Sequence, residues 1–329
     1  MKKQTKTALI VSAGLIVLGF IISFASAALA GFDLNALSTD SYTRKTAHIS
    51  ESFDSLRVSV SSHDIRLLPA EDGRCRVEYD EGDRSKFTVQ VSGGTLTVTN
   101  QSIKNWNIHL GFSFNYSEPQ VSVYLPESEY RQVQLQTSSG DIICDSGFSF
   151  EELSLSTTSG DIQLSGTATE LKADTTSGDI HVSSFTAARF SAGSTSGSLR
   201  ISDVTVTDPG PADGLYLHTT SGNVVLTDVR AENLRVSTTS GDIKLDHVLA
   251  AGNAQLGAVS GRIHLTLSDA ASFDISTTSG DVEGSLLSPK YFDVSTTSGK
   301  IDLPYDHPDG GHFKAKTVSG DVDIRIGDN

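Results

Sequence analysis

The sequence is poor in cysteine, methionine and tryptophan. Two cysteines, Cys75 and Cys144, one methionine and one tryptophan occur among 329 residues. Two cysteines do not make the disulfide framework of a small secreted domain, and a single tryptophan leaves little for an aromatic cofactor cage. The sequence therefore predicts neither a disulfide scaffold nor a bound cofactor.

Positive charge is scarce as well. The formal net charge is −15, and the three lysines of residues 1–32 contribute +3, which leaves −18 for residues 33–329. Such a charge opposes binding to nucleic acid and close contact with an anionic membrane surface.

Familiar catalytic motifs are also missing from the sequence. It contains no Gly-x-Ser-x-Gly elbow, phosphate-binding loop, dinucleotide fingerprint or His-Glu-x-x-His motif. Asp306, His307, Asp309 and His312 cluster near the C-terminus, but their spacing matches no metal-site template. We expect no catalytic residues, no metal site and no enzymatic activity.

The sequence is rich in a repeat built around Thr-Ser-Gly-Asp-Ile. A Ser-Gly pair occurs ten times, and the steps between the glycines are 20, 18, 19, 25, 19, 20, 19, 19 and 21 residues. A period near 20 with little scatter is typical of stacked repeats. The ten glycines are Gly140, Gly160, Gly178, Gly197, Gly222, Gly241, Gly261, Gly280, Gly299 and Gly320.

Apolar and polar residues alternate on both sides of each glycine, as in β-strands. In residues 153–164 this pattern predicts a turn at Gly160 and side chains that point inward at Thr157, Ser159 and Ile162. We expect a ladder of buried hydroxyls from the inward threonines and serines, and glycine at the corner because a sharp turn often needs a positive φ. The predicted fold class is all-β, a repetitive β-solenoid of about ten coils of about 20 residues, preceded by a small β-rich cap region and an N-terminal transmembrane helix.

Aspartate follows the glycine in six copies, which raises the possibility of a calcium row. Arg262 and Lys300 interrupt this row, so a turn role for aspartate is the better interpretation.

The position two before the glycine is expected to face outward and is usually threonine. A threonine row can order water or contact a sugar, although threonine is also a common strand residue. The aromatic stretch 106–116 equally suits a binding patch or a strand packed against the cap. The candidate surface-binding residues are Thr158, Thr176, Thr195, Thr220, Thr239, Trp106 and Tyr116.

The N-terminal segment, residues 1–32, has a different character. Three lysines precede an uncharged stretch of 26 residues from Thr7 to Phe32, and a bilayer core needs about 20 apolar residues. We expect a single-pass anchor with the C-terminal domain extracytoplasmic, or else secretion after cleavage near Ala27 or Ala30.

The expected organisation has four parts. They are an N-terminal signal-anchor segment at 1–32, a linker at 33–50, a β-rich N-terminal cap region at 51–128 and the β-solenoid repeat domain at 129–329. The longest repeat step contains an insertion at 203–214, which either marks the functional face or is a tolerated surface loop.

The repeats resemble those of the bacterial putative adhesin family, also catalogued as a domain of unknown function. Gly31-Phe32-Asp33 and the Val121-x-Val123-x-Leu125-Pro126 segment belong to the resemblance, which covers roughly residues 31–329. It implies an envelope-associated β-solenoid and brings no catalytic residues.

Taken together, these patterns predict a non-enzymatic cell-envelope protein, an adhesin or scaffold that presents an extracytoplasmic surface. Its partner is expected to be an envelope component, a glycan or a membrane protein, with the membrane contacted through the N-terminal helix. A regulatory ectodomain in envelope-stress signalling and a wall-polysaccharide enzyme of the β-helix type remain as alternatives.

Overall fold

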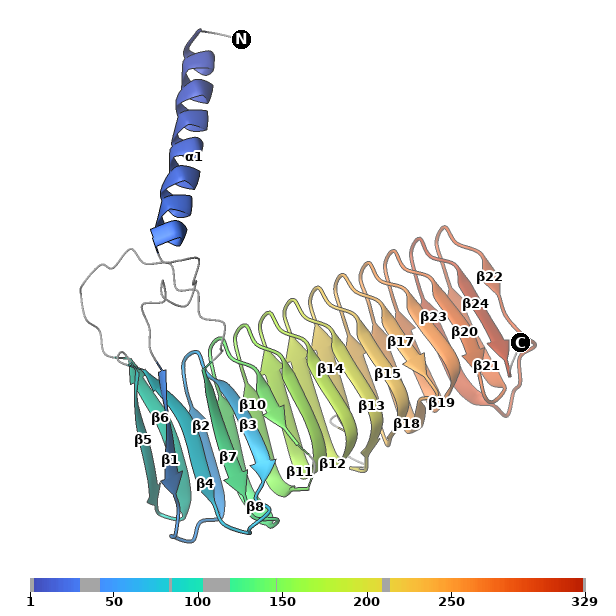
Figure 1. The fold of residues 1–329 in the computed structure, drawn as a ribbon. Helices are drawn as coiled ribbons and strands as arrows, with labels where there is room; N and C mark the ends of the chain where they lie inside the picture. Colours follow the sequence, from blue (N-terminus) through green and yellow to red (C-terminus); the bar gives the residue numbers. More distant parts are fainter. Residues whose placement is uncertain are drawn as a thin grey trace.

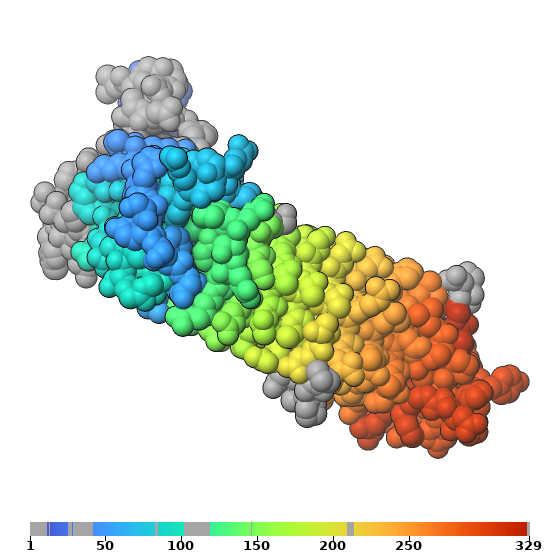
Figure 2. Space-filling view, turned by 90° about the horizontal axis from the view of Figure 1, so that it is seen from below, coloured from blue at the N-terminus to red at the C-terminus, as the bar shows by residue number. Residues whose placement is uncertain are grey.

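A computed structural model describes residues 3–29, 42–82, 85–102, 119–145, 147–208 and 214–327. Within these ranges the chain forms one helix and 24 strands, and the strands stack into an elongated rod (Figure 1). In the space-filling view the colours follow one another along the rod, so most of the chain advances steadily from one end to the other (Figure 2). The all-β prediction is confirmed.

Helix α1 (Lys3–Leu29) lies in the segment for which the sequence predicts a membrane anchor. No helix formed by the described residues combines the length and the apolar character that a membrane crossing requires. The predicted transmembrane helix is therefore not supported.

One of the two long sheets of the rod holds the strands that lead into the Thr-Ser-Gly turns. Its strands pair in parallel from β6 onward, and β5 closes it with an antiparallel pairing. Their order along the rod is β5 (Ser85–Ser92), β6 (Thr95–Ser102), β2 (Ser55–Ser59), β8 (Glu129–Gln136), β10 (Ser149–Ser156), β11 (Ile162–Thr175), β12 (Ile180–Ser194), β14 (Leu215–Thr219), β16 (Leu234–Ser237), β18 (Leu249–Gly257), β19 (Ile263–Ser276), β23 (Gly311–Lys316) and β21 (Lys290–Ser295).

The other long sheet holds the strands that leave these turns. It is parallel from β7 onward, and β1 and β4 close it with antiparallel pairings. The long strands β11, β12 and β19 bend round a corner and contribute to both sheets. The order is β1 (Tyr42–His48), β4 (Arg76–Gly82), β7 (Gln120–Leu125), β3 (Asp64–Pro69), β9 (Ile142–Cys144), β11, β12, β13 (Leu199–Val206), β15 (Val224–Ala231), β17 (Ile243–Asp246), β19, β20 (Val282–Leu286), β24 (Val322–Ile326) and β22 (Ile301–Asp302).

The order of coils along the rod differs from the order in the sequence at both ends. At the N-terminal end the β6–β7 coil lies outside the earlier β2–β3 coil. At the other end the chain skips one level, forms β21 and β22, and returns to insert β23 and β24 between them and β19–β20. The β21–β22 coil is therefore the terminal coil of the rod.

The predicted core positions form one continuous hydrophobic interior. The residue two after the glycine is at most 1% exposed in nine of the ten copies, and the exception is Ile301 of the terminal coil, at 45%. Cys144 is buried among these residues as a free thiol. Each fully buried aliphatic side chain contributes roughly 1.5–3 kcal/mol, and stacking lets neighbouring coils share this gain.

The residue three before the glycine, threonine in eight copies and serine in one, forms the predicted buried hydroxyl ladder, which Ala258 interrupts. Thr175 Oγ1 donates to the carbonyl oxygen of Gly160 on the preceding level at 3.1 Å and accepts the N–H of Gly178 at 3.1 Å. The same two bonds recur at Thr157, Thr238 and Thr317. Each hydroxyl thus joins two coils and satisfies a buried backbone donor.

The prediction that the serine before each glycine also points inward is wrong. Ser159, Ser177 and their equivalents are exposed. The strand alternation ends at the buried threonine, so the next two residues both lie on the outside of the corner.

The predicted reason for glycine at the corner is wrong as well. None of the ten repeat glycines is among the described residues with a positive φ. Instead, a Cβ atom built on Gly178 would overlap the carbonyl oxygen of Gly160, and the same overlap recurs from level to level. Glycine is required there because neighbouring coils approach backbone to backbone.

The second corner of the coil is where positive φ values occur. Ser184, Asp203, Asp228 and His247 each lie six residues after a repeat glycine and have φ between 51° and 54°. The alternation pattern in the sequence did not reveal this corner, because no single residue type recurs at this position in every copy.

Candidate functional site

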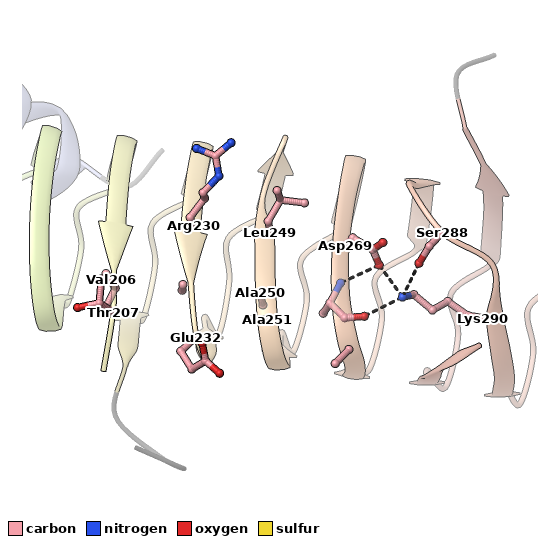
Figure 3. A pocket seen from close by; sticks show the side chains of 13 residues that line it. Val206, Thr207, Arg230, Glu232, Leu249, Ala250, Ala251, Asp269, Ser288 and Lys290 are labelled. Carbon is pink, nitrogen blue, oxygen red and sulfur yellow. Dashed lines mark hydrogen bonds and ion pairs between the residues drawn. The ribbon is translucent and has the colours of Figure 1, made fainter. Parts of the chain in front are cut away.

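A groove runs across five successive levels of the rod, and we name it the alanine groove (Figure 3). It has a volume of about 680 Å³. The residues that line it are Val206, Thr207, Arg230, Ala231, Glu232, Leu249, Ala250, Ala251, Asp269, Ala270, Ala271, Ser288 and Lys290.

Strand register places equivalent residues of successive coils beside one another in this groove. Ala231 pairs with Ala250, and Ala250 with Ala270. Their methyl groups are short, so this line along the rod is recessed between longer side chains. Ala251 and Ala271 are exposed beside it.

The residues that precede these three alanines form a second row, which is charged at both ends. Arg230 pairs with Leu249, and Leu249 with Asp269. A ligand along the groove would therefore meet a guanidinium at one level, an aliphatic side chain at the next and a carboxylate at the third.

Lys290 forms one end of the groove and is only 3% exposed. Its Nζ contacts Asp269 Oδ1 at 2.5 Å, the Ala270 carbonyl oxygen at 2.7 Å and Ser288 Oγ at 2.9 Å (Figure 3). Three acceptors match the three N–H donors of an ammonium group. A buried cation is tolerated here because it is paired and fully hydrogen-bonded.

The Ser288–Lys290 contact also has the form of a serine nucleophile beside a lysine base. A lysine base needs a free lone pair to take the serine proton. Because all three contacts of Nζ are with acceptors, the amine serves as a donor to Ser288. The arrangement is a structural clamp, and it joins the terminal coil to the levels around Asp269.

The predicted threonine row lies on a different line of the rod from the groove. Thr158, Thr176, Thr195, Thr220 and Thr239 are all exposed. The backbone holds them in line, since the carbonyl oxygen of Thr158 accepts the N–H of Ser177, and this bond repeats at the following levels. With the exposed serines beside them, they make two parallel columns of hydroxyls, which we name the hydroxyl ridge.

The other predicted candidates are placed only in part. Trp106 and Tyr116 lie outside the described residues. The 203–214 insertion is described up to Asp208 and again from Gly214, and its residues Val206 and Thr207 line one end of the groove.

The aspartates after the repeat glycines have a structural role that the sequence did not reveal. Asp161 N–H donates to Asp141 Oδ1 at 2.8 Å, and Asp179 N–H donates to Asp161 Oδ1 at 2.7 Å. Each carboxylate thus satisfies the backbone of the next coil. In the described part of the chain, no group of three or more potential His, Cys, Asp or Glu ligands gathers around a point.

A second hollow lies near the N-terminal end, and Cys75 and Tyr130 contribute to it. It has a volume of about 650 Å³. Burial raises the pKa of the Cys75 thiol to about 12, so the nucleophilic thiolate is disfavoured. Tyr130 donates its hydroxyl to the Pro126 carbonyl oxygen at 2.9 Å, a contact that fixes the wall of the hollow.

Several solved bacterial structures resemble this chain at low sequence identity. A protein from Parabacteroides distasonis titled a putative lipid binding protein is 16% identical with a TM-score of 0.42, covering 86% of this chain and 97% of its own. A putative adhesin from Bacteroides fragilis is 14% identical with a TM-score of 0.38, covering 87% and 98%. A putative adhesin from Parabacteroides merdae is 13% identical with a TM-score of 0.35, covering 88% and 98%.

No curated protein matches the chain. The family model described as Toastrack DUF4097 matches residues 53–325, which include the N-terminal coils as well as the ten Ser-Gly repeats. The chain therefore belongs to the Toastrack DUF4097 family, a domain of unknown function, and the family resemblance expected from its repeats is confirmed.

Proposed function

We propose that this protein is a non-enzymatic adhesin or scaffold of the cell envelope that holds an extended partner in the alanine groove. The observation that carries the proposal is the groove itself, an open channel along the rod in which three successive coils place Ala231, Ala250 and Ala270 in register. Ser288 and Lys290, a nucleophile–base pair in its described lining, are held as a donor–acceptor clamp.

The dimensions and chemistry of the groove favour a polypeptide segment as its occupant. Five levels at about 4.8 Å spacing cover about 19 Å, the length of about six residues of extended chain. The lining has no aromatic ring on which a sugar could stack. An apolar floor with a few charged groups above it suits an extended segment of an envelope protein.

The hydroxyl ridge is a second candidate surface, and it suits a glycan. Its paired columns of exposed threonine and serine present hydroxyls at regular intervals along the rod. Many weak contacts of this kind give useful binding only through repetition. The residues we propose for it are those predicted from the sequence, Thr158, Thr176, Thr195, Thr220 and Thr239.

The test is co-sedimentation of the full chain with purified cell walls and, separately, with envelope membranes before and after protease treatment. We expect pelleting with protein-containing membranes that is lost after protease. Ala251→Trp and Ala271→Trp fill the groove from exposed positions and should abolish this pelleting. Thr167→Trp, also exposed but outside the groove lining, is the matched control.

The same experiment separates the two surfaces. Pelleting with walls that survives Ala251→Trp but falls when Thr176 and Thr195 are both changed to alanine would favour the hydroxyl ridge. Pelleting that none of these variants alters would contradict both surfaces.

Envelope attachment remains a separate prediction. Retention in the membrane through residues 1–32 and release after cleavage near Ala27 or Ala30 give different mature N-termini. Cell fractionation with N-terminal sequencing of the mature protein distinguishes them.

A further inference from the structure

We propose that the terminal coil of the rod binds the terminal coil of a second copy, through a twofold, antiparallel pairing of the two β22 strands. The proposal rests on the adhesin function for its biological meaning, because it names a second copy of the chain as a further partner. It is carried by an open core, a free strand edge and a self-complementary charge pattern at one end of the rod.

The terminal coil leaves part of the hydrophobic core open. Ile301 is 45% exposed, whereas Val322, its neighbour on the inserted coil, is 1% exposed. Phe292, Val294 and Leu303 are only partly buried, and Tyr291 and Tyr305 are 43% and 99% exposed. Stacked repeats normally need a polar cap at such an end.

The backbone of β22 offers hydrogen bonds toward the open side. Val322 N–H donates to the Lys300 carbonyl oxygen at 2.8 Å, and Ile301 is in register with Val322. In a parallel ladder this arrangement turns the bonding groups of residues 300 and 302 toward β24 and those of Ile301 away from it. An antiparallel partner centred on Ile301 could exchange two N–H···O=C bonds with it.

The charges beside Ile301 fit the same pairing. If Ile301 lies opposite Ile301 of a second copy, Lys300 lies opposite Asp302 and Asp302 opposite Lys300. Lys300, Ile301 and Asp302 are all exposed, and opposite charges on facing strands stabilise a pair. The short sequence Lys-Ile-Asp is thus its own complement in an antiparallel arrangement.

A parallel, head-to-tail continuation of the rod fits this end less well. In the coils that carry Asp141 and Asp161 after the glycine, the aspartate Oδ1 accepts the backbone N–H of the equivalent residue in the next coil. Lys300 stands at this position in the terminal coil and offers a donor in place of an acceptor. Arg262 is a basic residue at the same position in an interior coil, and there the next coil supplies Asp281 and Glu283 as charge partners.

The loop that returns from β22 to β23 already covers the first part of β21. Phe292 N–H donates to Asp306 Oδ1 at 3.0 Å, and His307 N–H donates to the Lys290 carbonyl oxygen at 3.0 Å. The edge left open is therefore on the β22 side, so the pairing that we propose is short. We expect a weak dimer, which gains strength only where many copies face one another.

The position of the contact gives the dimer a defined geometry. The chain enters the rod at β1, at the end opposite to the terminal coil (Figure 1). A twofold contact between terminal coils directs the two N-terminal ends away from each other and closes after two copies. Such a pair suits a contact between two facing surfaces.

Sedimentation velocity of the full chain over a concentration series tests the proposal. The unaltered protein should form a concentration-dependent dimer. Lys300→Asp and Asp302→Lys each place like charges opposite one another and should raise the dimer Kd at least about tenfold. The double variant K300D/D302K restores opposite charges and should restore the dimer, with unfolding curves used to check that each variant folds.

Disulfide capture tests the register directly. Facing residues outside the hydrogen-bonded pair have Cα atoms about 4.5 Å apart, within the range of a disulfide. The double variant K300C/D302C should form a covalent dimer on oxidation, and Thr239→Cys on the hydroxyl ridge should not. Cys75 and Cys144 are buried and should not interfere.

A monomer at every concentration, or a double charge variant that fails to regain the dimer, would overturn the proposal. This outcome is distinguishable from a failure of the proposed function. Ala251→Trp should remove partner binding and leave the dimer intact, whereas Lys300→Asp should do the reverse.

Discussion

Glycine is required in each repeat because neighbouring coils leave no room for a Cβ atom at this position. A Cβ on Gly178 would overlap the backbone of Gly160, whereas a Cβ on Gly257 meets only Ser276 Oγ, at 3.8 Å. Neither glycine has a positive φ. The two positions therefore separate the effect of close approach from that of backbone freedom.

We expect Gly178→Ala to lower the free energy of unfolding by about 3 kcal/mol, because two packed backbones must move apart. Gly257→Ala should be neutral or slightly stabilising, since alanine restricts the unfolded chain. Urea unfolding followed by circular dichroism measures both changes. Equal losses for the two variants would contradict the explanation by close approach.

Among the described residues, a side chain occupies the glycine position only at the N-terminal end of the stack. Ser61-Ser62-His63-Asp64-Ile65 is a further copy of the repeat with histidine in place of glycine. Thr137 Oγ1 donates to the His63 carbonyl oxygen at 3.1 Å, as other threonines do to glycine. The ring of His63 packs edge-on against Tyr42 of β1 and Phe87 of β5.

His63 makes the stability of this end depend on pH. His63 is 1% exposed, Nε2 lies 2.9 Å from the Asp80 carbonyl oxygen, and Nδ1 has no hydrogen-bond partner among the described residues. Burial lowers the pKa of His63 below its usual value of 6.5. The stability that depends on neutral His63 is fully present above about pH 6.5 and is lost as the pH falls through the lowered pKa.

Urea midpoints at about pH 7.5 and about pH 5 measure this loss, because histidine charge changes within that range. His63→Phe should reduce the difference between the two midpoints. His247→Gln, at an exposed histidine, should leave the difference as in the unaltered protein. An unchanged pH dependence in His63→Phe would assign the effect to other groups.

Single-residue reasoning from the sequence succeeded where the strand pattern was regular and failed at the corners. The inward positions of Ile162 and Thr157 follow from alternation alone. The outward turn of Ser159 does not, because it depends on where the corner begins. His63 was missed because a search for Ser-Gly pairs cannot find the copy that lacks glycine.

At the C-terminal end, the sequence does not predict the order in which the strands stack. β21 and β23 carry similar patterns, Tyr-Phe-Asp-Val-Ser and His-Phe-Lys-Ala-Lys, so either could lie next to β19. The order is decided by contacts between distant residues, such as Lys314 Nζ with Asp274 Oδ1 at 3.1 Å. A repeat period predicts the coils but not their order.

Cysteine pairs can establish this order. Asp274 and Asp293 are each in register with Lys314, on opposite sides of it. Neighbouring strands lie about 4.8 Å apart and second neighbours about 9.6 Å, and a disulfide needs Cα atoms within about 7 Å. D274C/K314C should form a disulfide on oxidation, and D274C/D293C should not. The opposite result would mean that the coils stack in sequence order.

At the level of the whole rod, the two ends are closed to different degrees. Antiparallel strands β1, β4 and β5 and the ring of His63 cover the N-terminal end. The other end finishes in a coil whose core residues are partly exposed. The sequence predicted a cap before the repeats, but the open end follows from the inserted coil and could not be predicted without the stacking order.

This difference should appear as a gradient of local stability. In a stack of repeats each coil is stabilised by its neighbours, so a terminal coil with one neighbour opens at a lower free energy than an interior coil with two. We expect amide hydrogen exchange to be fastest in β21 and β22, intermediate in β23 and β24, and slowest in central strands such as β15 and β17. Exchange measured by mass spectrometry on peptides from each level gives the order directly.

If β21 and β22 were as protected as β15 at a concentration where the chain is monomeric, the terminal coil would be closed by contacts other than stacking. If their protection rose with concentration while that of β15 stayed constant, the second copy would be covering the open end.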